Sequence, residues 1–219
     1  MQAKRKLAPA LVEIIFDAAY LLFVISAGVY MLAAAQGRTA PMLYGAMALV
    51  LGCGDAFHLV PRIYAQATGK MDALVKPLGF GKLVTSVTMT VFYVLLYYVG
   101  IYVSGYARTA WITALVWGLA ALRIALCLFP QNKWFTKGGC FTWAVYRNIP
   151  FVLLGLLVLV QYMLLGGGAF RLMWLAILLS FAFYLPVVLY SSKNPKLGML
   201  MLPKTCAYIW IVCMGFSLL

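Results

Sequence analysis

The sequence predicts an all-α fold, a polytopic bundle of about seven transmembrane helices. Of its 219 residues, 66% are hydrophobic, which exceeds the roughly half that is usual in soluble domains. These residues are grouped in seven segments, each at least as long as the ~20 residues that cross a hydrocarbon core about 30 Å thick. Because lipid provides no water to satisfy open backbone groups, spanning segments of this length must be helical.

The expected helices, in chain order, are 8–35, 41–64, 83–106, 109–129, 142–166, 170–191 and 197–219. The first follows a basic N-terminus, as a signal peptide would, but it has no convincing cleavage site and is interrupted by Glu13 and Asp17. We therefore interpret it as a retained helix. Pro186 and Pro203 are expected to kink the sixth and seventh helices. The connections are short, so residues 1–219 are expected to form a single domain.

Positive charge alternates from loop to loop, and this alternation predicts the topology. One side is expected to hold ten basic residues: Lys4, Arg5, Lys6, Lys70, Lys76, Lys82, Lys133, Lys137, Lys193 and Lys196. The opposite connections contain only Arg38, Arg108 and Arg171. By the positive-inside rule, we expect the N-terminus in the cytoplasm and the C-terminus outside, in a multi-pass protein of the plasma membrane. This topology accounts for the net charge of +13 without a nucleic-acid partner.

Acidic residues are rare, and three of the four lie inside predicted helices: Glu13, Asp17 and Asp55. An ionised carboxylate at membrane depth costs roughly 2.5–3.5 kcal/mol or more, so it is rarely kept without a partner or a role. With the predicted orientation and a helical rise of about 1.5 Å per residue, all three lie in the cytoplasmic half of the membrane. We therefore expect the functional site there.

Other polar residues are expected at the same depth. Asp55, His58 and Arg62 are spaced i, i+3 and i+7 and share one helix face, while Glu13 and Asp17 are spaced i, i+4. Further polar side chains at this depth are Arg123, Arg147, Lys204 and Tyr208. The sequence thus predicts one cytoplasm-facing polar pocket within the membrane, where Asp55 approaches the first helix at Asp17 and the seventh at Lys204.

The same charges also have purely structural interpretations. Arg62, Arg123 and Arg147 lie near enough to the membrane interface for their side chains to reach lipid headgroups. Asp17, Asp55 and Lys204 could form ion pairs whose only role is to hold helices together.

No metal or cofactor is expected. His58 is the only histidine, which argues against the His-rich zinc site of ceramidase-type seven-helix hydrolases. The five cysteines form no CxxC pair and are expected to pack as small apolar residues. Lys204 could carry a retinal Schiff base, but the predicted topology is opposite to that of rhodopsins and no opsin motif surrounds it.

Residues 54–62, GDAFHLVPR, resemble a segment of the YhhN membrane family that begins with Gly-Asp and ends with Pro-Arg. That family includes the lysoplasmalogenases, polytopic enzymes of similar length that hydrolyse the vinyl ether bond of lysoplasmalogens. The stretch 79–93 loosely resembles the next family helix, in which Ser86 would match a serine, although the histidine that follows it is missing. The late acidic motif is also absent; Ser180 is the nearest match to its serine, and the family tends to have eight helices.

The resemblance implies that Asp55 is catalytic. Vinyl ether hydrolysis needs a proton delivered to carbon and then attack by water on the oxocarbenium ion. A carboxylic acid in a low-dielectric setting suits the first step. A second carboxylate, Asp17 or Glu13, could stabilise the cation or orient the water, as in glycoside hydrolysis. The expected substrate-binding residues, of which the cations would hold a lipid phosphate, are His58, Arg62, Arg123, Lys204 and Tyr208.

Two other functions are compatible with the sequence. A polar pocket of acids and bases also suits a transporter or binding protein for a small anionic or zwitterionic solute, including a proton-coupled carrier. A membrane scaffold whose charges only orient its helices is the third alternative. The expected partners are membrane lipids, with a lysophospholipid or a small charged solute in the pocket.

The predicted topology can be tested with C-terminal reporter fusions. Because the positive charge favours an outside C-terminus, alkaline phosphatase fused there should be active and a cytoplasm-dependent fluorescent reporter should be dark. The reverse pattern would contradict the topology and would place the polar residues in the outer half of the membrane.

Overall fold

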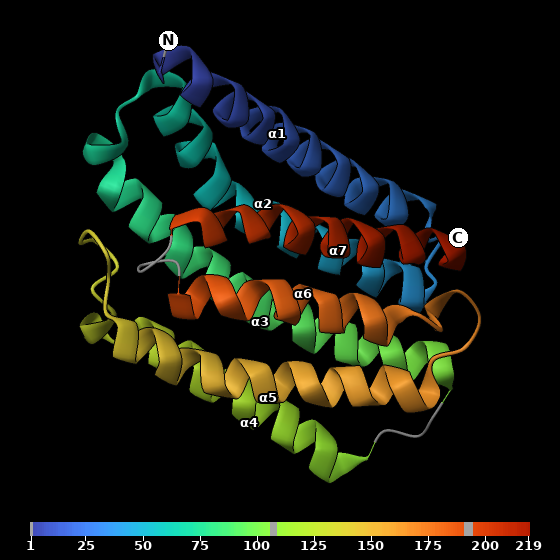
Figure 1. The fold of residues 1–219 in the computed structure, drawn as a ribbon. Coiled ribbons are helices and arrows are strands. Elements are labelled where there is room, and N and C mark those ends of the chain that lie inside the picture. Colours follow the sequence, from blue (N-terminus) through green and yellow to red (C-terminus); the bar gives the residue numbers. More distant parts are fainter. Residues whose placement is uncertain (1, 106–108, 191–194) are drawn as a thin grey trace.

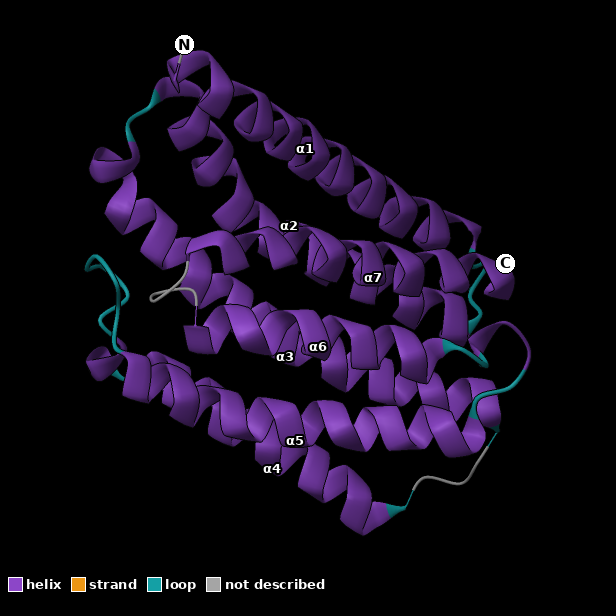
Figure 2. Ribbon diagram, in the orientation of Figure 1, coloured by secondary structure: helices purple, strands orange, loops and turns teal. Residues whose placement is uncertain are grey.

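The computed structural model describes residues 2–105, 109–190 and 195–219, with side chains from residue 11 onward except at 195 and 196. Within these ranges the chain consists of helices, turns and loops, and it contains no strand (Figures 1 and 2). Seven helices are long and apolar enough to cross a membrane. The predicted all-α fold is therefore confirmed, and the chain is a multi-pass membrane protein.

The seven long helices are α1 (Gln2–Ala34), α2 (Thr39–Thr68), α3 (Val75–Ser104), α4 (Ala110–Leu128), α5 (Phe141–Leu165), α6 (Met173–Tyr190) and α7 (Met201–Met214). Short 3-10 helices are η1 (Met71–Leu74), η2 (Pro130–Asn132), η3 (Gly168–Phe170), η4 (Pro195–Leu200) and η5 (Gly215–Leu218). Consecutive helices run antiparallel, and α3 packs against α2, α4 and α5 (Figure 1). Helix α7 closes the bundle by packing against α6 and α1.

The starts of α3 and α7 differ from the sequence prediction, and a proline lies near each of them. Helix α3 begins at Val75 rather than near residue 83, because Pro77 lies in its first turn, where a missing N–H costs no hydrogen bond. Lys82, expected in a loop, is therefore two turns inside this helix. Pro203 lies in the first turn of α7, directly after η4, so it does not interrupt a long helix as expected. Pro186 does lie inside α6.

The half of the bundle that holds the 35–38 and 166–172 connections is filled with apolar side chains. At most 1% of each of the following is exposed: Val24, Met31, Tyr44, Met47, Leu51, Phe92, Leu96, Val99, Leu154, Val158, Met173, Ile177, Ile211 and Val212. Two buried tyrosine hydroxyls in this half donate to backbone carbonyl oxygens: that of Tyr44 to Ile211, and that of Tyr162 to Leu96 at 3.0 Å. This half is a closed apolar core. Of the five cysteines, however, only Cys127 is fully buried, and Cys53, Cys206 and Cys213 are exposed, so packing explains fewer of them than expected.

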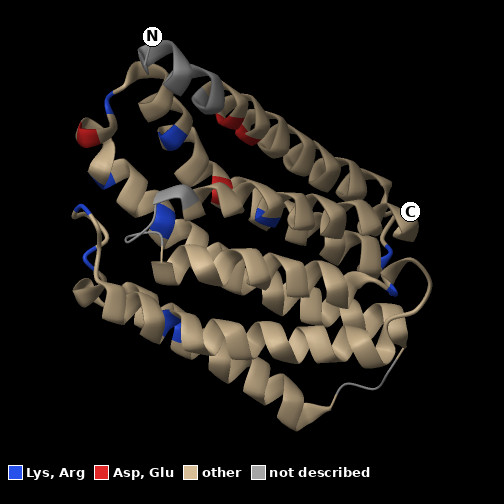
Figure 3. Cartoon of the chain, in the orientation of Figure 1, with Lys and Arg blue, Asp and Glu red and all other residues tan. Residues whose placement is uncertain are grey.

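Charged residues gather at the opposite end (Figure 3). The apolar end carries Arg171 and Arg38, and Arg38 donates to the carbonyl oxygens of Leu218 and Leu219 at 2.9 and 3.0 Å. Arg108 and Lys193 lie outside the described residues, as do the side chains of Lys4, Arg5, Lys6 and Lys196. The asymmetry agrees with the charge pattern of the sequence; which end faces the cytoplasm stays a prediction.

Close packing of α2 against α3 depends on glycine and can be tested by substitution. A Cβ added at Gly81 would overlap the carbonyl oxygen of Phe57 and lie 2.6 Å from the Cα of His58. Because backbone atoms cannot move aside, Gly81→Ala should separate the helices and cost about 1–3 kcal/mol. A thermal melt of the purified protein measures this loss. In Gly118→Ala, the matched control in α4, the new Cβ meets nothing within 4 Å and the melting temperature should not fall; equal losses would contradict the packing account.

Candidate functional site

A cavity lies between the helices at the charged end of the bundle, and all seven long helices contribute to its wall. About 200 Å³ within it is accessible to water, enough for several water molecules or a small polar group. The eight residues expected to form a site all line this cavity: Glu13, Asp17, Asp55, His58, Arg62, Arg123, Lys204 and Tyr208. The structure thus brings together the side chains that sequence spacing placed at one depth.

The two carboxylates of α1 have different surroundings. Glu13 forms an ion pair with Arg62 of α2 and accepts a hydrogen bond from Nε2 of Gln66 at 2.8 Å. Asp17, one turn further along α1, is only 6% exposed, and its Oδ2 has no hydrogen-bond partner. Glu13 and Arg62 therefore fasten α1 to α2, whereas Asp17 presents a free carboxylate oxygen to the cavity.

Asp55 is held on one of its two oxygens. The hydroxyl of Tyr20, which is 2% exposed, donates to Oδ2 of Asp55 at 2.7 Å. The expected approach of Asp55 to α1 is thus found, through Tyr20. No ion pair within 4.0 Å joins Asp55 to Lys204 in the described part of the chain. One oxygen of Asp55 remains available to a ligand in the cavity.

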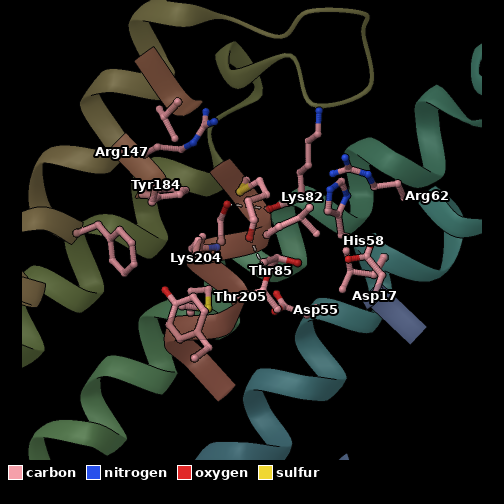
Figure 4. Close-up of a pocket in the computed structure, with 18 of the residues that line it drawn as sticks. Asp17, Asp55, His58, Arg62, Lys82, Thr85, Arg147, Tyr184, Lys204 and Thr205 are labelled. Carbon is pink, nitrogen blue, oxygen red and sulfur yellow. Dashed lines mark hydrogen bonds between the residues drawn. The ribbon is translucent and has the colours of Figure 1, made fainter. Parts of the chain in front are cut away.

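The Gly-Asp pair explains how α2 presents Asp55. At Gly54 the helices approach so closely that an added Cβ would overlap Oγ1 of Thr88. Thr85, one turn earlier in α3, donates from Oγ1 to the carbonyl oxygen of Gly54 at 3.1 Å. The missing side chain at Gly54 therefore lets α3 pack against α2, and Asp55 enters the cavity beside Thr85 (Figure 4).

Arg123 is a buried cation without a counterion. It is 2% exposed, and Cζ of its guanidinium lies 3.2 Å from the ring centroid of Phe151. Its Nε and one terminal nitrogen have no hydrogen-bond partner, and within the described residues no carboxylate lies within 4.0 Å of it. The side chain is buried inside the bundle and does not reach its surface, so the structure does not favour the lipid-headgroup interpretation for Arg123.

Two further cations lie on the same side of the cavity. Lys204 Nζ is 5.1 Å from the ring centroids of both Tyr184 and Tyr208. Arg147 donates to Oδ1 of Asn132 at 2.7 Å and lies 4.1 Å above the ring of Trp134. These partners are aromatic rings and a neutral amide, which attract a cation but do not neutralise its charge.

The cavity therefore has two chemically distinct sides. Figure 4 shows Arg147, Tyr184 and Lys204 grouped on one side of the view, while Asp17, His58 and Arg62 lie on the other. Five basic residues line the wall, Arg62, Lys82, Arg123, Arg147 and Lys204, against three carboxylates, Glu13, Asp17 and Asp55. The formal excess of two positive charges, combined with the unpaired Arg123, favours an anionic ligand.

Some residues that line the cavity, or that bond to a residue lining it, were not expected from the sequence as site residues. Tyr20 lies three residues after Asp17, a spacing that places both on one helix face and that could have identified it. Tyr184 and Trp134 gave no signal, because aromatic residues are common in membrane helices and at their ends. His58 lines the wall with Nδ1 buried and unpartnered. Within the described residues, no three His, Cys, Asp or Glu side chains are grouped so that they could hold a metal ion.

Comparison with known proteins gives no relative from which a role could be transferred: no family model, no curated protein and no solved structure matches this chain. The resemblance of residues 54–62 to the YhhN family stays a prediction. The geometry of the cavity is therefore the basis for assigning a function.

The two carboxylates of α1 should differ in their effect on stability. Glu13→Gln leaves the partly buried Arg62 without its counterion and should cost about 1–3 kcal/mol of unfolding free energy. Asp17→Asn removes a charge that has no bonded partner, so it should leave the melting temperature unchanged or raised. Denaturation of both purified variants in the same detergent measures the contrast. A larger loss for Asp17→Asn would contradict the assigned pairing.

Proposed function

We propose that this protein is a membrane-embedded hydrolase that binds a lysophospholipid in the cavity through its phosphate group and cleaves its vinyl ether bond. The observation that carries the proposal is the set of Arg123, Arg147 and Lys204, which have no carboxylate within 4.0 Å in the described part of the chain and line the same cavity as Asp55 and Asp17. The YhhN-like segment around Asp55 supports the same reaction. The proposal includes a cavity that opens toward the cytoplasm and a location in the plasma membrane.

The side of the cavity that holds Arg147 and Lys204, together with Arg123, suits a phosphate group. A buried guanidinium without a counterion is costly, and a phosphate that accepts its free N–H groups would remove that cost. Arg123 supplies these N–H groups, and Lys204 adds a positive charge at similar depth. Arg62 was also expected to bind phosphate, but its ion pair with Glu13 favours a structural role instead.

The two carboxylates Asp55 and Asp17 suit proton transfer to carbon. Asp55, in its protonated form, would give its proton to the β-carbon of the vinyl ether, which forms an oxocarbenium ion at the α-carbon. Asp17 would stabilise this cation and orient the water that attacks it, and one proton of that water would return to Asp55. The bond between the hemiacetal carbon and the glycerol oxygen then breaks, and the hydroxyl proton is transferred to that oxygen, which gives a fatty aldehyde and the glycerophosphodiester. Tyr20 would position Asp55 through its bond to Oδ2.

The alternatives from the sequence have less support. A transporter would have to open a route through the half of the bundle beyond the cavity in a second conformation, and in this structure that half is packed with apolar side chains that are at most 1% exposed. A scaffold whose charges only orient helices would be expected to pair each buried cation with an acid. Glu13 and Arg62 fit that description, but Arg123 does not.

Asp55→Asn is the direct test of the proposed reaction. The substitution keeps the shape of the side chain and removes the transferable proton, so release of aldehyde from choline and ethanolamine lysoplasmalogens should fall by at least about 10²-fold. The melting temperature should stay close to that of the wild type, because no ion pair is lost.

Asp72→Asn is the matched control. Asp72 lies in η1 with its side chain 86% exposed, paired at 2.8 Å with Lys137, and its loss should leave aldehyde release unchanged. A stable and fully active Asp55→Asn protein would contradict the proposed role. An unfolded one would favour a structural role for Asp55, and a wild-type protein that releases no aldehyde would reject the hydrolase itself.

A further inference from the structure

Two apolar grooves lie on the outside of the bundle at the level of the charged cavity. The first runs between α5 and α6 and is lined by Val145, Asn148, Ile149, Val152, Leu153, Leu185, Val188 and Leu189. The second runs between α2 and α3 and is lined by Ala56, Phe57, Val60, Pro61, Pro77 and Phe80. Both lie within membrane-spanning segments, so hydrocarbon chains of lipids are the molecules available to fill them.

The grooves differ in how they are separated from the cavity. The α2–α3 groove shares no lining residue with the cavity, and behind it the helices meet backbone to backbone where Gly81 lies against Phe57. The α5–α6 groove shares Val188 with the cavity wall. Phe151 and Tyr184 line the inner side of the same two helices. Only side chains therefore separate this groove from the charged interior.

One hydrogen bond crosses between α5 and α6 at this level. The hydroxyl of Tyr184 donates to Oδ1 of Asn148 at 2.8 Å, and Nδ2 of Asn148 donates to the carbonyl oxygen of Ala144 at 2.6 Å. Pro150 and Pro186 lie close by in the two helices and cannot donate backbone hydrogen bonds, which makes local helix bending easier. A polar contact that joins the two helices between an apolar groove and a charged cavity is well placed to open and close.

We propose that the α5–α6 groove binds the hydrocarbon chain of the amphiphile whose phosphate-bearing headgroup occupies the cavity. This inference rests on the proposed function, and it adds where the hydrocarbon chain of the substrate lies. Removing a long alkyl chain from lipid into a polar cavity is unfavourable, since apolar surface would be exposed to polar groups. In the groove the chain stays in contact with the bilayer while the headgroup passes the Tyr184–Asn148 contact to reach Arg123 and Lys204.

The test is photolabelling with a saturated 16-carbon alkyl-ether lysophosphatidylcholine that carries a diazirine at the end of its chain. The saturated ether cannot undergo the proposed hydrolysis, so labelling reports binding alone. In lipid nanodiscs, labelled peptides should come from residues 145–153 and 185–189 of the wild-type protein, and an excess of the unlabelled ether should remove the label. Labelling in the α2–α3 groove, an even spread around the bundle, or a lack of competition would overturn the inference.

Paired variants make the test independent of folding. Val188→Trp and Ile149→Trp should reduce α5–α6 labelling several-fold, and Ile149 is 52% exposed, so a larger side chain there fits without repacking the core. Val60→Trp, in the other groove, should leave the labelling unchanged. Equal effects of all three would overturn the inference. Failure of the proposed function gives a different result. In that case α5 and α6 are still labelled and excess unlabelled ether still removes the label, but the protein releases no aldehyde from lysoplasmalogens.

Discussion

The cost of burying charge in an apolar bundle is the constraint on which the rest of this structure depends. Buried charges in the cavity are stabilised in two different ways. Glu13 and Arg62 neutralise each other, with Gln66 as an additional partner, and thereby join α1 to α2. Arg123 lies against the face of Phe151, which stabilises a cation without neutralising it. The difference between a paired and an unpaired cation separates the residues that hold the bundle from those assigned to the ligand.

Packing keeps that charge confined to one half of the molecule. Beyond the cavity, the bundle is closed by side chains such as Met47, Phe92 and Leu154, none of which is exposed to solvent. At the charged end, Gly54 and Gly81 let the backbones of α2 and α3 pack closely, so no opening is left between these helices. Between α5 and α6, by contrast, larger side chains separate the helices. The cavity is therefore closed toward the apolar end, and along α5 and α6 the side chain of Val188 lines both the cavity and an outer groove.

The sequence was most informative about the membrane depth and the helix face of the polar residues. It was least informative about which side chains they contact on other helices. Hydropathy located the seven helices, and the i, i+3, i+7 spacing of Asp55, His58 and Arg62 correctly placed them on one wall. The start of α3 was missed because lysine, proline and glycine at 76–82 lower the hydropathy of a segment that is helical. The choice of Glu13 over Asp17 as the partner of Arg62 depends on helix crossing and side-chain rotamers, which periodicity does not encode. Tyr184 could be assigned to the site only from its contacts with Asn148 of α5 and Lys204 of α7.

The central claim, that unpaired cations select an anionic headgroup, is tested most directly by comparing two amphiphiles with the same alkyl chain. One carries a phosphate headgroup and the other an uncharged headgroup, and each competes with a bound lipid probe in nanodiscs. The account predicts that the wild-type protein prefers the phosphate, that Arg123→Gln loses this preference, and that Arg171→Gln, at the opposite end of the bundle, keeps it. Equal binding of the two amphiphiles by the wild type, or an undiminished preference in Arg123→Gln, would contradict it.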